Sequence, residues 1–277
     1  SVVEPGAEPR RAAGESLPLL SGDRAVFRWF EPASREMIER LLPSYLQRRR
    51  VLVSPRDVTS CEITQVAPIR VGEIEVWFLI IQIEPRDGPV ETYSLGLTLV
   101  PSPELGSLLE PLESAGFARL EGPKGGVLCD AMAVPTCCRG LLRGILSGRS
   151  RPYSRGEIEA GPLPGQAAFE LDGIADVALS TRRGAGGVTT VFYGTSYVLK
   201  TLSRVEDGVV PDLEVGRRFG ERAAEIGISP VLGAIEYRRR EAEPITLAVL
   251  HRYLANQGTA WQFTLDQLSK YFERVSA

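Results

Sequence analysis

The sequence predicts an α+β protein in which mainly antiparallel sheets carry few helices. Between 90 and 100, every second residue from Tyr93 to Leu99 is apolar and the residues between them are Thr, Ser or Gly, as in a half-buried strand. The run W-F-L-I-I at 77–81 is apolar throughout, which is typical of a central strand covered on both faces. P-R-D-G-P at 85–89 supplies a hairpin turn between these two segments.

The first elements indicate a small sheet with one helix, which we take as an N-terminal cap subdomain at 17–103. Residues 1–16 are polar, with Pro and Gly, and are expected to form a flexible leader. Ser34 could cap a helix whose apolar residues recur at near-helical spacing up to Leu46, with Pro43 kinking or splitting it. The predicted strands that follow are 58–66, 74–84 and 90–100.

A second unit is expected after a seam at 101–106. Residues 127–147 predict a helix that Pro135 interrupts, and 148–166, which carries Gly, Pro, Ser and Arg, predicts an exposed loop. The predicted strands are 169–180, 188–193, 197–202, 228–237 and 245–253, with helices at about 211–225 and 264–275. We assign 104–255 to this unit and 256–277 to the start of a linker or further lobe.

Composition excludes two classes of function. Hydrophobic content of 43% and charged content of 24% are those of a soluble globular protein, and the net charge of −3 argues against a general nucleic-acid footprint. No apolar run reaches the roughly 18 residues that cross a bilayer, and the first residues have no apolar core typical of a signal peptide. Neither a nucleic acid nor a membrane is an expected partner.

The chain has four cysteines, Cys61, Cys129, Cys137 and Cys138, and the adjacent Cys137 and Cys138 are interpreted as small buried residues. No two of the four form a C-x-x-C pair, and the chain has one histidine. A zinc site is therefore not expected. Free thiols fit a reducing, cytoplasmic location.

The turn R-R-G-A-G-G-V-T-T at 182–190 leads into a strand. Glycine lets backbone N–H groups approach a phosphate closely, although the segment matches neither common phosphate-binding pattern. An ordinary hairpin loop explains it equally well.

One lysine, Lys200, lies in an apolar strand, and its charge requires a partner. Glu214, in the first turn of the next helix, is one candidate. Alternatively, the helix dipole alone favours Glu214, which would then form a routine surface pair with Arg218 at i+4.

The order of elements favours a kinase small lobe. A glycine-bearing hairpin, a strand with one lysine, a helix with one glutamate and two further strands follow one another, and in kinases the lysine holds nucleotide phosphates while the glutamate orients it. The strand ending L-A-V-L-H-R-Y-L at 247–254 would be the hinge whose backbone meets adenine. The predicted nucleotide-binding residues are Gly186, Gly187, Thr189, Lys200, Glu214, Leu250, Arg252 and Tyr253, with ATP and Mg²⁺ as the expected ligands.

These segments resemble maltokinase, the kinase that makes maltose 1-phosphate and is often fused behind trehalose synthase. The resemblance rests on K-T-L-S-R-V-E-D-G-V-V-P-D-L-E-V-G-R, V-L-G-A-I-E-Y-R-R and L-A-N-Q-G-T-A-W-Q-F-T-L-D in matching order. Upstream, L-P-S-Y-L-Q-R-R-R at 42–50, E-T-Y at 91–93 and G-V-L-C-D-A at 126–131 follow the same plan. It covers about 17–277 and implies a cap plus the ATP-binding lobe of a sugar kinase in trehalose or α-glucan metabolism.

Two segments depart from that family. R-V-L-V-S-P at 50–55 stands where the family has R-W-F-x-G-K, and G-A-G-G-V-T-T at 184–190 replaces E-Q-S-N-T-S. The catalytic Asp loop of H-G-D type is missing, because His251 is the only histidine and 26 residues follow it. The chain alone is therefore expected to be inactive, with a missing large lobe or a fused trehalose synthase domain as its partner. The alternative is a non-catalytic scaffold attached to such an enzyme. Apolar surface left by a missing lobe could also support a homodimer.

Overall fold

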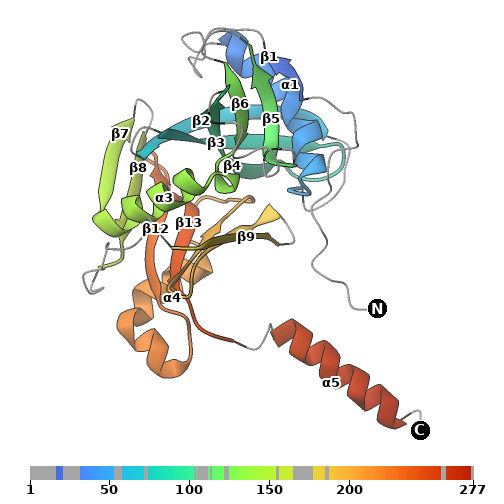
Figure 1. Cartoon of the computed structure of the whole chain (residues 1–277), viewed down its shortest axis with the longest axis vertical. Coiled ribbons are helices and arrows are strands. Elements are labelled where there is room, and N and C mark those ends of the chain that lie inside the picture. The colour runs from blue at the N-terminus through green and yellow to red at the C-terminus, as the bar shows by residue number, and fades with distance from the viewer. Residues whose placement is uncertain are drawn as a thin grey trace.

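The computed structural model confirms the α+β class: two largely antiparallel sheets carry few helices (Figure 1). It describes residues 17–20, 32–52, 58–71, 74–102, 104, 112, 114–121, 125–153, 156–164, 177–184, 187–256 and 260–275. The predicted leader and most of the strand predicted at 169–180 lie outside these residues.

The first sheet has six strands in the order β1-β5-β6-β4-β3-β2, and only β1 pairs in parallel. Its strands are β1 (Leu19–Leu20), β2 (Val58–Val71), β3 (Ile74–Pro85), β4 (Glu91–Pro101), β5 (Gly116–Leu120) and β6 (Gly126–Asp130). Helix α1 (Pro32–Arg48) continues through Pro43 and buries Ile38, Leu42 and Leu46 against one face. The proposed boundary near 103 falls between β4 and β5, both of which belong to this sheet.

Two predictions between 127 and 166 are wrong. The helix predicted from 127 begins at Pro135, because G-V-L-C-D is the fully buried strand β6 and Asp130 caps a short 3₁₀ turn at Ala131–Ala133. Helix α3 then runs over Pro135–Ser147. The predicted loop at 148–166 is the hairpin of β7 (Arg149–Tyr153) and β8 (Gly156–Pro162), in which Ile158 and Ala160 are buried. Its Gly and Pro content hid a period-two pattern.

The second sheet has seven strands in the order β7-β8-β12-β13-β11-β10-β9, and all its pairs are antiparallel. Beyond β7 and β8 its strands are β9 (Leu179–Arg183), β10 (Thr189–Tyr193), β11 (Tyr197–Thr201), β12 (Val231–Arg238) and β13 (Ile245–Arg252). Helix α4 (Pro211–Phe219) and the 3₁₀ segment Gly220–Ile226 connect β11 to β12.

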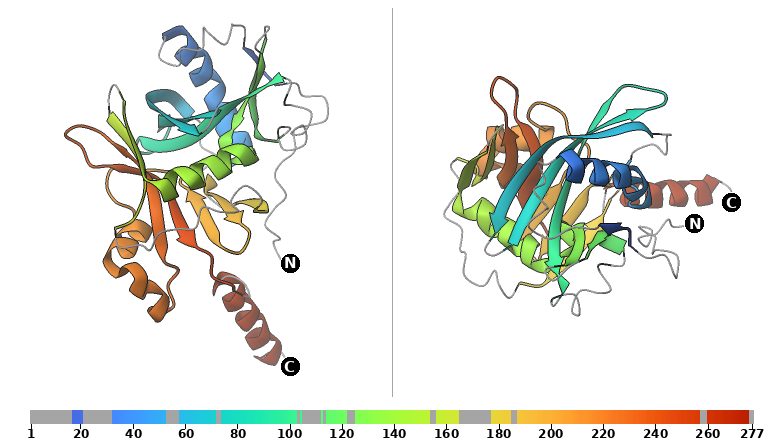
Figure 2. Two further views of the ribbon diagram at one scale, coloured as in Figure 1. Left: turned by 60° about the vertical axis from the view of Figure 1, so that its left-hand side comes forward. Right: turned by 90° about the horizontal axis from the view of Figure 1, so that it is seen from above.

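One apolar core joins the two sheets. Helix α3 lies between them in the left view of Figure 2, with Leu141, Leu142 and Ile145 buried. The same core includes Phe78 of the first sheet and Leu250 of the second. Cys137 and Cys138 are buried free thiols, as predicted, and Cys129 is buried as well. Burial raises the pKa of the Cys137 thiol to about 12. Cys61, by contrast, is only half-buried.

A buried ion-pair network links the first sheet to the second sheet. Asp130 Oδ2 lies 3.0 Å from Arg49 Nη2 and 2.6 Å from Arg183 Nη2, and its Oδ1 accepts from Met132 N at 2.9 Å. The Asp130 and Arg49 side chains are each 6% exposed. Burial would raise the pKa of Asp130, but the guanidinium groups of Arg183 and Arg49 hold it below its ordinary value. Asp130 is therefore a charged residue at the point where three separate segments meet.

Helix α5 (Ala260–Val275) projects away from both sheets (Figure 1). Its described apolar side chains are exposed: Phe263, Leu265, Leu268, Tyr271, Phe272 and Val275. No helix in the described part of the chain is long and apolar enough to cross a membrane.

Gly216 allows α4 to lie directly on β12. A Cβ at position 216 would stand 2.4 Å from the Cβ of buried Val231, well inside the roughly 3.5–4.0 Å of an ordinary carbon contact. We expect Gly216→Ala to lower the free energy of unfolding by about 1–3 kcal/mol through overpacking, measured by urea denaturation. Gly144 of α3 is the matched control, because nothing lies within 4 Å of its added Cβ and alanine there should be neutral or stabilising. Equal losses in both variants would contradict the packing explanation.

Candidate functional site

Strand β11 places Lys200 near the middle of one face of the second sheet. Lys200 pairs with Thr190 of β10 on one side and with Val249 of β13 on the other. Val198 and His251 form another pair of the same register, two residues further along each strand. Because alternate residues of a strand point to the same face, His251 and Lys200 project on the same side.

Helix α4 packs on this face. Pro211 is its first residue, and Leu213 is fully buried in a small cluster with Val249. This position brings the first turn of the helix over β11, where Lys200 Nζ donates to Asp212 Oδ2 at 3.0 Å.

The acidic partner of Lys200 is therefore Asp212 and not Glu214, which is exposed. Residues two positions apart on an α-helix point about 200° away from each other. Asp212 faces the sheet, so Glu214 faces solvent. Both are acidic residues of the first turn, and the sequence signal used for Glu214 applied equally to Asp212.

The Lys200–Asp212 pair is accessible to a ligand. The two side chains are 40% and 52% exposed, and a pair this open contributes at most about 1 kcal/mol to stability. A half-exposed ammonium held at one end of a helix remains available to an anion from solution.

His251 is the buried member of this cluster. Its side chain is 9% exposed, and Nε2 lies 3.5 Å from Asp212 Oδ2, which is longer than an ordinary hydrogen bond. Within the described residues, Nε2 makes no hydrogen bond. His251 and Lys200 together hold the pKa of Asp212 well below its ordinary value, so the carboxylate is charged at neutral pH.

The glycine-bearing turn packs against the segment that follows α1. Gly187 has φ of +77°, and a Cβ there would lie 2.8 Å from the Cα of Val51. Its carbonyl accepts from Ser203 Oγ at 2.5 Å. Internal packing therefore already requires this glycine. Gly186 lies outside the described residues.

The remaining predicted residues divide between the two faces and the backbone. Thr189 pairs with Thr201 and Leu250 with Leu199, one position out of phase with Lys200, so both side chains lie on the opposite face. The backbone N–H groups of Arg252 and Tyr253 donate at 2.9 Å to the carbonyls of Pro230 and Ser196. An adenine base bound at this segment would have to form hydrogen bonds with backbone groups other than these two N–H groups.

Besides Asp212, the sequence-based prediction missed three residues of this region: Arg182, Phe192 and His251. The guanidinium of Arg182 lies 5.1 Å from the centroid of the Phe192 ring, which lies 6.3 Å from that of Tyr253. Arg182 pairs with Thr190, and Phe192 pairs with Val198, so both share the face of Lys200. In β10, the alternation of Phe192 with buried Val191 and Tyr193 was the signal available. His251 was not among the predicted binding residues, although its register places it on the same face as Lys200.

The face thus combines one accessible amine, one more cation at Arg182, and a half-buried aromatic and aliphatic surface at Phe192 and Val198. Cations beside a flat apolar surface suit a ligand with an anionic end and an aromatic end.

No family model matches the chain. Solved structures similar to it include a glucosamine kinase in complex with glucosamine, ADP and inorganic phosphate, with 16% identity and a TM-score of 0.42 over 78% of this chain and 41% of that chain. Two crystal forms of glucosamine kinase, A and B, give 14% and 15% identity with TM-scores of 0.41 and 0.40. The matches to crystal forms A and B cover 79% and 78% of this chain. In each of the three matches the chain spans 41% of the glucosamine kinase.

Proposed function

We propose that the chain binds Mg-ATP through β9–β13 and α4, as the nucleotide-binding small lobe of a sugar kinase. One observation carries this proposal: the strands lie in the order β9-β10-β11-β13-β12, and α4 covers the face on which β11 presents Lys200 to an acidic residue. That is the arrangement of a lysine strand and a carboxylate helix with which kinases hold nucleotide phosphates.

The residues on this face fit a nucleotide. Lys200 would hold phosphate oxygens, Asp212 would orient its amine, and Phe192 and Val198 would contact the base. The buried His251 Nε2 lacks a hydrogen-bond partner among the described residues and lies beside the amine that a phosphate would approach. Mg²⁺ would enter with the phosphates, whose charge it neutralises.

The resemblance to maltokinase suggests the wider role. In this proposal residues 17–103 are the cap, 104–255 the small lobe and 256–277 the start of a connection to a large lobe. That lobe would supply the catalytic Asp and the maltose site, so that the whole enzyme makes maltose 1-phosphate in trehalose or α-glucan metabolism. Exposed α5 would pack against it.

A second candidate function is a non-catalytic scaffold. The observation that favours it is Gly187, whose close approach is to Val51 of the cap, so the turn has an internal role without any ligand. The backbone N–H groups of 252 and 253 are likewise engaged within the protein.

Isothermal titration of the intact chain with Mg-ATP distinguishes the two. The small-lobe proposal expects saturable binding at one site, with a matching rise in melting temperature because a ligand stabilises the state that it binds. Titration with Mg²⁺ alone and with adenosine separates metal and base effects. Absence of both heat and melting shift at millimolar Mg-ATP would favour the scaffold.

A further inference from the structure

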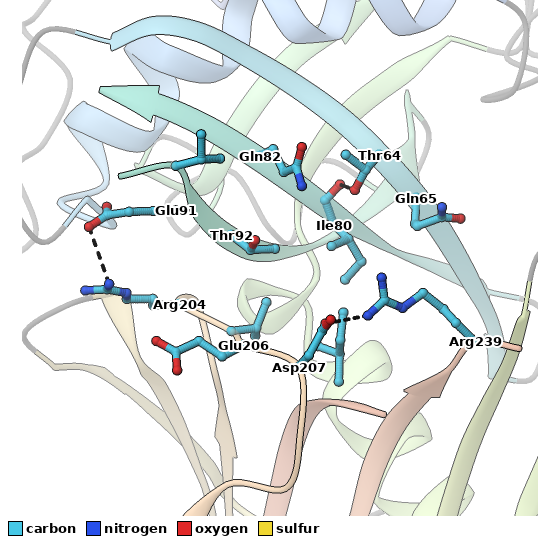
Figure 3. Close-up of a pocket in the computed structure, with 13 residues that line it drawn as sticks. Thr64, Gln65, Ile80, Gln82, Glu91, Thr92, Arg204, Glu206, Asp207 and Arg239 are labelled. Atoms are coloured by element: carbon cyan, nitrogen blue, oxygen red, sulfur yellow. Dashed lines mark hydrogen bonds and ion pairs between the residues drawn. The ribbon is translucent and has the colours of Figure 1, made fainter. Parts of the chain in front are cut away.

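A polar pocket lies at the seam between the cap and the second sheet, and it shares no residue with the Lys200 cluster (Figure 3). Its volume is about 440 Å³, within the range of roughly 300–1,000 Å³ typical of small-molecule sites, which often form between domains. Its walls are Thr64, Gln65, Ile80, Gln82, Val90, Glu91, Thr92, Arg204, Val205, Glu206, Asp207, Arg239 and Ile245.

Backbone hydrogen bonds hold both walls in place. The segment that follows β11 crosses to the cap strand β4, where Ser94 N donates to Ser203 O at 2.7 Å and Val205 N donates to Thr92 O at 3.0 Å. Further along, Gly208 N donates to Pro244 O at 2.9 Å. The pocket therefore has ordered walls.

On the cap side of the pocket, the residues of β3 change from buried and apolar to exposed and polar. On the face of β3 that packs on the core, Val76, Phe78 and Ile80 are buried and apolar, and the next residue in the same alternation is Gln82, which is exposed. Gln82 pairs with Thr92 of β4, and the side chains of both line the pocket. Within the described chain neither side chain makes a hydrogen bond, so an amide and a hydroxyl are available side by side.

The charges of the pocket are balanced within its walls. Arg204 Nη2 lies 3.5 Å from Glu91 Oε1, and Arg239 forms an ion pair with Asp207. Figure 3 shows these two pairs apart, with Glu91 and Arg204 to the left of Asp207 and Arg239. Both cations are therefore engaged, and the remaining charged lining residue, Glu206, would repel an anion.

We propose that this pocket binds a neutral polyhydroxylated ligand, a sugar or the end of a glucan chain. The amide of Gln82 and the hydroxyl of Thr92 can each donate and accept, as sugar hydroxyls require, and the exposed apolar side chain of Val90 can contact C–H faces. Uncompensated positive charge for a phosphate is missing from the lining residues.

Titration of the intact chain tests the proposal, by calorimetry and by saturation-transfer NMR. The probes are glucose and maltose for free sugars, a soluble glucan for a chain end, and glucose 1-phosphate as the anionic counterpart. We expect saturable binding of a neutral probe, weaker binding of glucose 1-phosphate, and no competition by Mg-ATP. Tighter binding of the glucan than of the free sugars assigns the ligand to a chain end, and the reverse assigns it to a free sugar.

Gln82→Ala and Thr92→Val test the location. Each is expected to weaken sugar binding about fivefold or more through a lost hydrogen bond, while Gln267→Ala on exposed α5 leaves the affinity unchanged. Circular dichroism confirms that each variant is folded. The proposal is overturned if no neutral probe binds at tens of millimolar, if both pocket variants retain wild-type affinity, or if glucose 1-phosphate binds more tightly than glucose. Because Mg-ATP is titrated separately, failure here leaves the nucleotide proposal standing.

Discussion

Replacing Asp130 by alanine is expected to lower the free energy of unfolding by about 3–5 kcal/mol, because removing one partner of a buried ion pair leaves the other charge uncompensated. Arg49 would keep a guanidinium that is 6% exposed, and Arg183 would lose a contact of 2.6 Å. Met132 N would also lose its acceptor. Urea denaturation followed by circular dichroism measures the change.

Asp207→Ala is the matched control for that prediction. Asp207 also pairs with an arginine, Arg239, but its side chain is 60% exposed, so its removal should cost below about 1 kcal/mol. A loss at Asp130 no larger than that at Asp207 would mean that Arg49 and Arg183 find other partners, and the network would not hold the first sheet to the second sheet.

The same network predicts a pH dependence. The pKa of Asp130 is lowered in the folded state, so its contribution to stability is fully present above the unfolded value of about 3.9 and declines as the pH falls through the folded value. The difference in unfolding free energy between wild type and Asp130→Asn should therefore be constant from pH 5 to 8 and shrink in acid. A constant difference down to pH 2 would contradict this assignment.

Local sequence patterns predicted strands β3 and β4 of the first sheet and the order of β10, β11, α4, β12 and β13. The apolar run at 77–81 lies in β3 and the alternation from Tyr93 to Leu99 lies in β4. Such patterns can be recognised because the burial of each residue in a strand follows from the strand's own sequence. The prediction at 148–166 was wrong because it used the Gly and Pro content of the segment and not the alternation of its residues. This segment forms a hairpin in which Ile158 and Ala160 are buried.

Contacts distant in sequence could not be predicted in the same way. Arg49 lies in L-P-S-Y-L-Q-R-R-R and Asp130 in G-V-L-C-D-A, two of the segments that carry the family resemblance. Neither segment contains a pattern that predicts the ion pair between these two residues. The choice between Asp212 and Glu214 likewise depended on the rotation of α4 about its axis. That rotation is set by Leu213 and Gly216, which pack on β12 and β13.

Removing the Lys200 amine is expected to weaken Mg-ATP binding roughly 10- to 100-fold, since a hydrogen bond to a charged group contributes about 1.5–3 kcal/mol. In a thermal assay with ligand at 100 times the wild-type Kd, stabilisation of about 2.7 kcal/mol would fall to about 0.4 kcal/mol for a 100-fold loss. Lys270→Ala, which removes an exposed amine on α5, should retain the full stabilisation. A Lys200→Ala variant with unchanged affinity would place the nucleotide elsewhere.

The acidic partner can be tested in the same assay. Asp212 touches both Lys200 and His251, so Asp212→Ala is expected to change Mg-ATP affinity more than Glu214→Ala does. Its loss removes the group that orients the Lys200 amine and also leaves His251 without the carboxylate that faces it. If Glu214→Ala has the larger effect, α4 must rotate when nucleotide binds, because the two carboxylates point about 200° apart on one helix and cannot both reach Lys200 in one orientation.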